Sequence, residues 1–200
     1  MKRITTIFLS LFIIVTIQAQ PGWTASKENF QFAKKITISE SAGKNFRYEM
    51  AVRSEGVDTL TGVQFFGIAT DSHDRLTSNK FLTIEKRSEQ EWTIFTIVGQ
   101  LPANAANIWF FTDVTTTGTY YFDDISLFLE TQPGSWKQLG IRNSSFEDKS
   151  PELFAGYAIM KQKSGNPTTS LSEKIFKTGK HSLMITYVEE STPKNLLSGE

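Results

Sequence analysis

Short stretches in which apolar and polar residues alternate follow one another along this chain, and almost none has the period of a helix. The cleanest is 46–53, in which every second residue from Phe46 to Val52 is apolar and the residues between them, from Arg47 to Arg53, are mostly charged. Successive side chains of a strand point to opposite faces, so this pattern predicts a half-buried antiparallel strand.

The same reasoning predicts further strands, separated by turn-forming residues, at 33–39, 62–69, 81–85, 91–98, 107–112 and 120–129. In the first of these we expect Lys34, Lys35 and Thr37 to face solvent, with Ile36 and Ile38 facing inward. Because no helix is expected between these strands, the predicted fold class is all-β, an antiparallel β-sandwich of the jelly-roll type.

The predicted domain boundaries depend on two signals. The stretch 119–129 combines aromatic and β-branched residues with an Asp pair, which indicates the closing strand of a sandwich, and 142–148 looks like the opening strand of another. We therefore expect a first module at 20–130, a linker at 131–140, and the first part of a second, truncated module at 141–200. On this interpretation 21–135 folds alone, while Phe146, Phe154, Ile159, Leu183 and Ile185 lack a covering sheet.

Residues 1–19 predict a secretory signal peptide. Lys2 and Arg3 precede the apolar run 7–17, which is about half the ~20 residues needed to span a bilayer, and cleavage is expected near Ala19. No later segment is apolar enough to form a transmembrane segment. The mature protein is expected to be secreted or periplasmic, and without any cysteine its core must be stable without disulfides.

Both boundary signals resemble galactose-binding-like jelly rolls, in particular the carbohydrate-binding modules of the cellulase-C type. The resemblance is carried mainly by 121–127 (Tyr-Phe-Asp-Asp-Ile-Ser-Leu) and 143–147 (Asn-Ser-Ser-Phe-Glu), and a Gly179, Ser182, Leu183, Ile185 pattern supports it. It implies a non-catalytic module that binds glycans and that is usually attached to a secreted hydrolase.

The resemblance also implies a structural Ca²⁺, because a carboxylate in the closing strand and a glutamate in the opening strand clamp the ion in such modules. The corresponding candidates here are Asp123, Asp124 and Glu147, with Glu28 the nearest glutamate at the start of the first module. The alternative is that Asp123 and Asp124 accept hydrogen bonds from backbone amides at a bulge.

Alternation supplies the candidate ligand-binding residues. If Ile108 and Phe110 fill the core, Trp109 and Phe111 point outward, where aromatic rings can pack on sugars. The remaining candidates, which could contribute a further ring or hydrogen bonds to hydroxyl groups, are Tyr121, Arg47, Glu49 and Arg53. The alternative is that these aromatic residues are covered and the charged residues only solvated; Trp92 is expected in the core.

Several functions are disfavoured. The 21 basic and 21 acidic residues give a formal net charge of zero, without the basic stripe that nucleic acid requires. The loop 71–74 contains Asp71, His73 and Asp74 but has no metal-site spacing, and a turn explains it. No nucleophile elbow, zinc motif or phosphate loop is present, so we do not expect an enzyme.

Two functions remain open. The first is an exported carbohydrate-binding protein whose partner is a glycan or polysaccharide. The second is a spacer or docking region, without a ligand of its own, of a larger secreted hydrolase whose C-terminal catalytic domain is absent from this chain.

Overall fold

The computed structural model describes residues 30–38, 41–56, 60–148, 156–161 and 167–188. These residues form antiparallel strands and one short 3-10 helix, η2 (Leu60–Gly62). The strands are β1 (Phe30–Thr37), β2 (Asn45–Glu55), β3 (Val63–Thr70), β4 (Phe81–Glu89), β5 (Trp92–Gln100), β6 (Asn107–Val114), β7 (Gly118–Gln132), β8 (Ser135–Leu139), β9 (Ala158–Lys161), β10 (Thr168–Ser172) and β11 (Ser182–Tyr187). The predicted all-β class and all seven predicted strands before residue 130 are confirmed.

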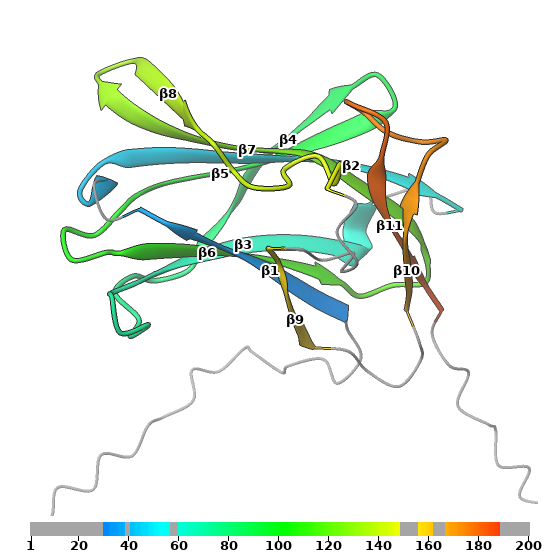
Figure 1. Ribbon diagram of the computed structural model, residues 1–200, viewed down its shortest axis with the longest axis horizontal. Coiled ribbons are helices and arrows are strands. Elements are labelled where there is room, and N and C mark those ends of the chain that lie inside the picture. Colours follow the sequence, from blue (N-terminus) through cyan, green and yellow to red (C-terminus); the bar gives the residue numbers. More distant parts are fainter. Residues whose placement is uncertain (1–29, 39–40, 57–59, 149–155, 162–166, 189–200) are drawn as a thin grey trace, which may run out of the picture.

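The strands lie in two layers, as expected for a β-sandwich (Figure 1). We call β9-β1-β6-β3, the lower layer in Figure 1, the β6 sheet. The upper layer, β4-β5-β2-β7-β11-β10 with β8 also paired to β7, is the β2 sheet. β4 joins the layers, because it pairs with β5 along most of its length and with β3 at Leu82 and Phe81.

The core lies between the two sheets and is rich in aromatic rings. Tyr48 of β2 stacks on Phe110 of β6 with ring centroids 3.7 Å apart, and Phe32 of β1 meets the edge of Phe122 of β7 at 5.5 Å. The predicted inward faces are confirmed, since Phe46, Tyr48, Met50, Val52, Ile108 and Phe110 all belong to this core. Burial of such rings is the main source of stability in a chain without disulfides.

β7 organises the β2 sheet because it is long enough to pair with two strands along the same edge. Its first half pairs with β11 and its second half with β8, and the Asp123–Asp124 bulge lies between these two halves. Asp124 has a φ of 53°, the left-handed conformation that a bulged residue adopts. The closing strand predicted from the Asp pair is therefore a central strand that carries a bulge.

The segment after residue 141 requires a correction. In the described residues its strands extend the same two sheets: β9 pairs with β1, β11 pairs with β7, and β10 pairs with β11. Phe146, Leu183 and Ile185, expected to lack a covering sheet, are each fully buried in the common core. Ile159 is 47% exposed, as expected. The expected boundary nevertheless does not separate two sets of strands, because Phe146, Leu183 and Ile185 fill the sandwich before it.

Three local predictions also need correcting. Residues 143–147 form turns instead of an opening strand, with a φ of 54° at Asn143 and 55° at Phe146, and they insert the Phe146 ring against Tyr157. The expected linker contains β8, and β10 was not predicted from its short polar sequence. Phe154, Glu28 and the predicted signal peptide lie outside the described residues.

Lys34 was expected to face solvent but is buried. It follows Phe30 and Phe32 on the inward face of β1, and its Nζ donates a hydrogen bond of 2.7 Å to the carbonyl oxygen of Arg142. The ammonium also lies 4.1 Å from the ring centroid of Tyr157. Burial, helped by the positive charge of Arg142, lowers the pKa of Lys34 to about 8.

Candidate functional site

The predicted ligand-binding residues are divided between the two outer faces of the sandwich. Trp109 and Phe111 lie on the outer face of the β6 sheet, as predicted, because Ile108 and Phe110 face the core. The residues predicted from β2 and β7, which are Arg47, Glu49, Arg53 and Tyr121, alternate with core residues of the other sheet. Tyr121 therefore cannot join Trp109 in one platform.

On the outer face of the β6 sheet the aromatic rings stack on one another. Phe111 is parallel to Phe66 within 8°, with centroids 4.8 Å apart, and to Trp109 within 20° at 6.2 Å. Parallel rings at these distances present their faces to each other rather than to solvent. Lysine ammonium groups lie over both ends, Lys35 at 5.2 Å from Trp109 and Lys80 at 4.5 Å from Phe66.

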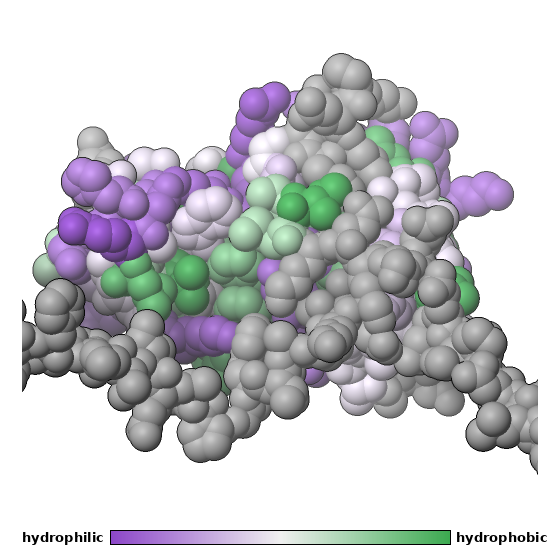
Figure 2. All heavy atoms as spheres, turned by 90° about the horizontal axis from the view of Figure 1, so that it is seen from below, coloured by the Kyte–Doolittle hydropathy of each residue, from purple (hydrophilic) through white to green (hydrophobic). Residues whose placement is uncertain are grey.

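Figure 2, which views the molecule from the side of the β6 sheet, shows apolar residues gathered in the middle of this face. Phe111 is only 9% exposed despite its outward direction. The stack therefore stabilises the sheet, and a sugar ring would have to displace Lys35 or Lys80 to reach an aromatic face.

The outer face of the β2 sheet has a different arrangement around Arg47. The guanidinium carbon of Arg47 lies 4.6 Å from the ring centroid of Phe128 and 5.3 Å from that of Trp136. Its Nε is 3.4 Å from Oε1 of Glu49, two residues along the same strand. Trp136 is 38% exposed, so this face brings an accessible indole, a guanidinium and a carboxylate together.

Polar residues lie beside Glu49 on the neighbouring strands of the sheet, as the strand register shows. The residue opposite Glu49 is Ser126 on β7 and Thr96 on β5, and Thr96 in turn faces Glu85 on β4. At the β8 end, Nε2 of Gln138 donates a hydrogen bond of 3.2 Å to Oγ of Ser126. Thr96 itself is buried. We call the other residues of this part of the face, which are exposed or half-buried, the open half: Arg47, Glu49, Glu85, Val98, Ser126, Phe128, Trp136 and Gln138.

Trp136 was missed by sequence reasoning because 131–140 was interpreted as a linker. Residues 132–135 (Gln-Pro-Gly-Ser) instead form the turn of the β7–β8 hairpin, in which Gly134 has a φ of 79°. Its backbone N–H donates to Oε1 of Glu130 at 2.8 Å. The signal was present, because Pro-Gly between two alternating stretches is a hairpin pattern.

The other half of this face is covered. Trp92, Ile94, Ala51 and Tyr121 form a second, smaller apolar cluster, against which Ile175 and Met184 pack. Trp92 is thus buried, as expected, but outside the main core. The Tyr121 hydroxyl donates to Glu55 at 2.8 Å and Arg53 pairs with Glu91, so neither joins Arg47 and Glu49.

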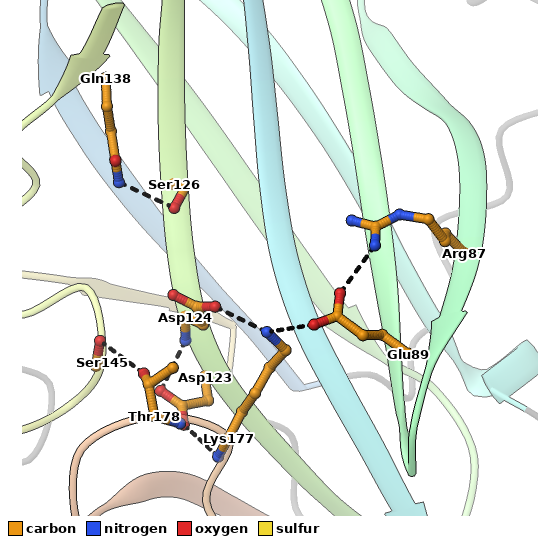
Figure 3. Close-up of polar contacts among 9 residues, drawn as sticks. All are labelled: Arg87, Glu89, Asp123, Asp124, Ser126, Gln138, Ser145, Lys177 and Thr178. Carbon is orange, nitrogen blue, oxygen red and sulfur yellow. Dashed lines mark hydrogen bonds and ion pairs between the residues drawn. The ribbon is translucent and has the colours of Figure 1, made fainter.

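The segment that covers this half of the face includes Ile175, Lys177 and Thr178, and Asp123 binds its backbone at the bulge of β7 (Figure 3). Its Oδ2 accepts hydrogen bonds from the backbone N–H groups of Lys177 at 2.7 Å and Thr178 at 3.0 Å, and its Oδ1 accepts from Asp124 N at 2.7 Å. Complete burial raises the pKa of Asp123 to about 6, even though these N–H donors favour the charged form.

Lys177 makes the second contact between the covering segment and the β2 sheet. Its Nζ lies 3.0 Å from Oδ2 of Asp124 on β7 and 3.2 Å from Oε1 of Glu89 on β4 (Figure 3). These strands flank β2 and β5 in the sheet order, so the Lys177 ammonium bridges across the face. Burial of Lys177 would lower its pKa, but hydrogen bonds to Asp124 and Glu89 raise it.

Glu147 holds the following turn. Its Oε1 accepts hydrogen bonds from the backbone N–H groups of Lys180 and His181 at 2.7 and 2.8 Å, and Oε2 lies 2.8 Å from Nδ1 of His181. Burial would raise the pKa of Glu147, but these donors hold it below its usual value. Glu147 thus holds residues 180 and 181, next to residues 177 and 178 that Asp123 holds.

The three predicted calcium ligands, Asp123, Asp124 and Glu147, make contacts within the protein itself. N–H groups donate to both oxygens of Asp123, and Oδ2 of Asp124 meets the Lys177 ammonium. Within the described ranges, no group of three or more His, Cys, Asp or Glu side chains is placed to hold a metal ion. The alternative from the sequence, bulge carboxylates that accept hydrogen bonds from backbone N–H groups, describes the observed contacts of Asp123. The calcium expectation is untested.

The loop containing Asp71 is a turn held by its own side chains. Oδ1 of Asp71 accepts hydrogen bonds from the backbone N–H groups of His73 at 2.8 Å and Arg75 at 3.0 Å. Asp74 pairs with Lys35 at 2.6 Å. This agrees with the expectation that turn chemistry explains these residues.

Comparison of this chain with protein-family models, with curated proteins and with solved structures found no match. In the part of the chain that the structure describes, no helix is long and apolar enough to cross a membrane.

Proposed function

We propose that this is an exported, non-catalytic protein that binds glycans on the open half of the β2 sheet. One observation carries the proposal: the exposed ring of Trp136 lies beside Arg47, whose guanidinium also covers Phe128 and pairs with Glu49. An apolar ring surface and paired polar groups are therefore available in one place.

This combination matches the chemistry of a sugar ring. The C–H groups on one side of a pyranose pack on an aromatic face, while its hydroxyl groups both donate and accept hydrogen bonds. Arg47 supplies only donors, Glu49 only acceptors, and the Gln138 amide supplies both. Charged donors and acceptors give the stronger hydrogen bonds, so Arg47 and Glu49 would fix the orientation of the sugar.

The stacked face of the β6 sheet is less suited to this role. Phe111 is covered by rings on both sides, and Trp109, with the Lys35 ammonium 5.2 Å from its ring centroid, is less exposed than Trp136. A ligand there would first have to break contacts that the free protein already makes, which costs binding free energy.

Affinity electrophoresis in gels containing soluble polysaccharides tests the proposal. We expect retention on at least one polysaccharide, and we expect Trp136→Ala to weaken it about tenfold, which corresponds to ~1.4 kcal/mol. Arg47→Ala should have a similar effect. The unfolding midpoint of Trp136→Ala should stay near that of the native chain, because this ring is outside both apolar clusters.

Phe176→Ala is the matched control, because Phe176 is 40% exposed, close to the 38% of Trp136. It should bind like the native chain. Retention unchanged in both Trp136→Ala and Arg47→Ala would refute the assignment of the site. No retention on any glycan would refute the function and favour the spacer role in a larger hydrolase.

A further inference from the structure

Strand β10 has a free edge whose residues are suited to pair with a second copy of this chain. We propose that two copies pair antiparallel along β10, so that their two β2 sheets become one continuous sheet. The pairing itself does not depend on the proposed function, whereas its effect on glycan binding rests on that function.

The first observation concerns the free edges of the sandwich. Among the described residues three strands have a single neighbour, and these are β8, β9 and β10. The unpaired N–H and C=O groups of such an edge can pair with another chain, and charged residues in the edge strand, above all lysines, oppose this pairing. β8 contains Lys137 and β9 ends on Lys161, whereas β10 consists only of Thr, Ser and Leu. Of these three strands, β10 therefore lacks the usual protection.

The second observation is that the outer face of β10 carries only hydroxyl groups. Leu171 lies opposite Leu183 of the core, so the alternate residues Thr168, Ser170 and Ser172 share the outer face. A second copy that approached this edge would meet no charged residue of β10 on either face.

The third observation is that the sequence of β10 is complementary to itself. Antiparallel pairing of two identical strands requires a two-fold axis, and with this axis at Ser170 all five residues find a partner. Thr168 then faces Ser172 of the second copy on the outer side, and Thr169 faces Leu171 on the inner side. Pairs of Thr and Ser on neighbouring strands are favourable because their hydroxyl groups bond to each other.

The same sheet already contains a hydroxyl pair of this kind. Oγ1 of Thr119 on β7 lies 3.2 Å from Oγ1 of Thr186 on β11, and Thr186 in turn lies opposite Thr168 on β10. This row of threonines ends at the free edge. In the proposed dimer Ser172 of the second copy continues it.

The symmetry decides how the two binding faces are arranged. Antiparallel neighbours in one sheet are related by an axis perpendicular to that sheet, so both outer faces point to the same side. In Figure 1 β8 lies at one end of the upper layer and β10 at the other, so pairing at β10 leaves Trp136 uncovered. Two open halves on one side can bind the same polysaccharide together, which raises retention without any new contact.

Sedimentation velocity of the native chain without glycan tests the pairing. The edge is five residues, about 17 Å, long, so the interface is small and we expect a dissociation constant on the order of 10–100 µM. Ser170→Lys should stay monomeric at about 500 µM, because two like charges would meet at the axis. Ser88→Lys is the matched control, since it adds the same charge at an exposed residue of β4 and should dimerise like the native chain.

A charge exchange identifies the edge. Ser170→Lys and Ser170→Glu should each be monomeric, and their mixture should form a dimer, because opposite charges then meet at the axis. A mixture that stays monomeric while the native chain dimerises would overturn the assignment to β10. A native chain that is monomeric at about 500 µM would overturn the pairing altogether.

Hydrogen exchange gives a second measurement that needs no variant. The backbone amides of β10 should exchange at least about threefold more slowly at high than at low concentration of the native chain, while those of β8 should not change. Equal rates for β10 at both concentrations would also overturn the pairing.

The gels separate this inference from the proposed function. Ser170→Lys should be retained about fivefold to tenfold less than Ser88→Lys. Equal retention, with the dimer present in solution, would overturn the joint action of the two sites. If no polysaccharide retains the native chain, the proposed function and this joint action are both wrong, and sedimentation still decides the pairing.

Discussion

The two outer faces of this sandwich carry similar residue types and use them differently. On the β6 sheet the rings of Trp109, Phe111 and Phe66 stack on each other and lysines cover the ends. On the β2 sheet the aromatic contacts are made with Arg47, and Trp136 keeps an exposed surface. The difference teaches that an outward aromatic residue is a candidate for binding only when a large part of its ring stays exposed, as in Trp136 at 38% and not in Phe111 at 9%.

The largest expected effect is on the stacked face. Phe111→Ala should lower the free energy of unfolding by about 3 kcal/mol, because it removes the central ring of a nearly buried stack. Phe128→Ala, a partly buried ring on the other face, should lower it by about 1 kcal/mol. Urea unfolding of both variants measures the difference. Equal losses would break the comparison, because they would show that both faces serve stability alike.

The next effect sharpens the comparison through the segment that covers part of the outer face of the β2 sheet. The pKa of Asp123 is about 6 in the folded chain, above the ordinary value of 3.8, so the folded state binds this proton more tightly than the unfolded state. The resulting stabilisation is fully present below about pH 3.8 and is lost as the pH rises through about 6. Its size is on the order of 3 kcal/mol.

Urea unfolding from pH 4 to pH 7, with Asp123→Asn as the comparison, measures this contribution. The native chain should lose more stability over this range than Asp123→Asn, whose side chain does not titrate. Parallel pH profiles would show that Asp123 has an ordinary pKa.

A smaller effect on glycan binding is expected when the guanidinium of Arg47 is replaced by an ammonium group. Arg47→Lys keeps the charge but loses the planar guanidinium that lies over Phe128 and Trp136. We expect a loss of about 1 kcal/mol in glycan binding, measured by titration calorimetry with a soluble polysaccharide. Lys35→Arg on the stacked face is the control and should leave binding unchanged. Full affinity in Arg47→Lys would reduce the role of Arg47 to its charge.

The smallest expected effect is that of calcium. Because N–H donors already occupy the oxygens of Asp123 and Glu147, melting in calcium and in chelator should give the same midpoint. An ion that bound only the folded state would add about 2.7 kcal/mol at a hundredfold excess over its dissociation constant. A shift of that size would show that an ion displaces these donors.

The sequence predicted most of the strands and the direction of their side chains because alternation is a local property. Phe46 to Val52 and Ile108 to Phe110 needed only period two to be assigned correctly. The errors concern residues whose neighbours are distant in sequence. Lys34 is buried where the carbonyl oxygen of a residue 108 positions later accepts a hydrogen bond from its ammonium, and Phe146 is buried because it packs on Tyr157.

For the candidate site, the sequence identified Arg47 and Glu49 but placed Trp109 and Tyr121 beside them. Only the tertiary structure could separate these residues, because alternation assigns a side chain to one face of its strand without saying to which sheet that strand belongs or which part of that sheet is covered. The sequence by itself determined the fold class, the core faces and the bulged strand with its Asp pair. Strand pairing decided the rest: it joined the segment after 141 to the first strands, placed Trp136 next to Arg47, and laid Lys177 across the face, since these contacts join residues that no local pattern connects.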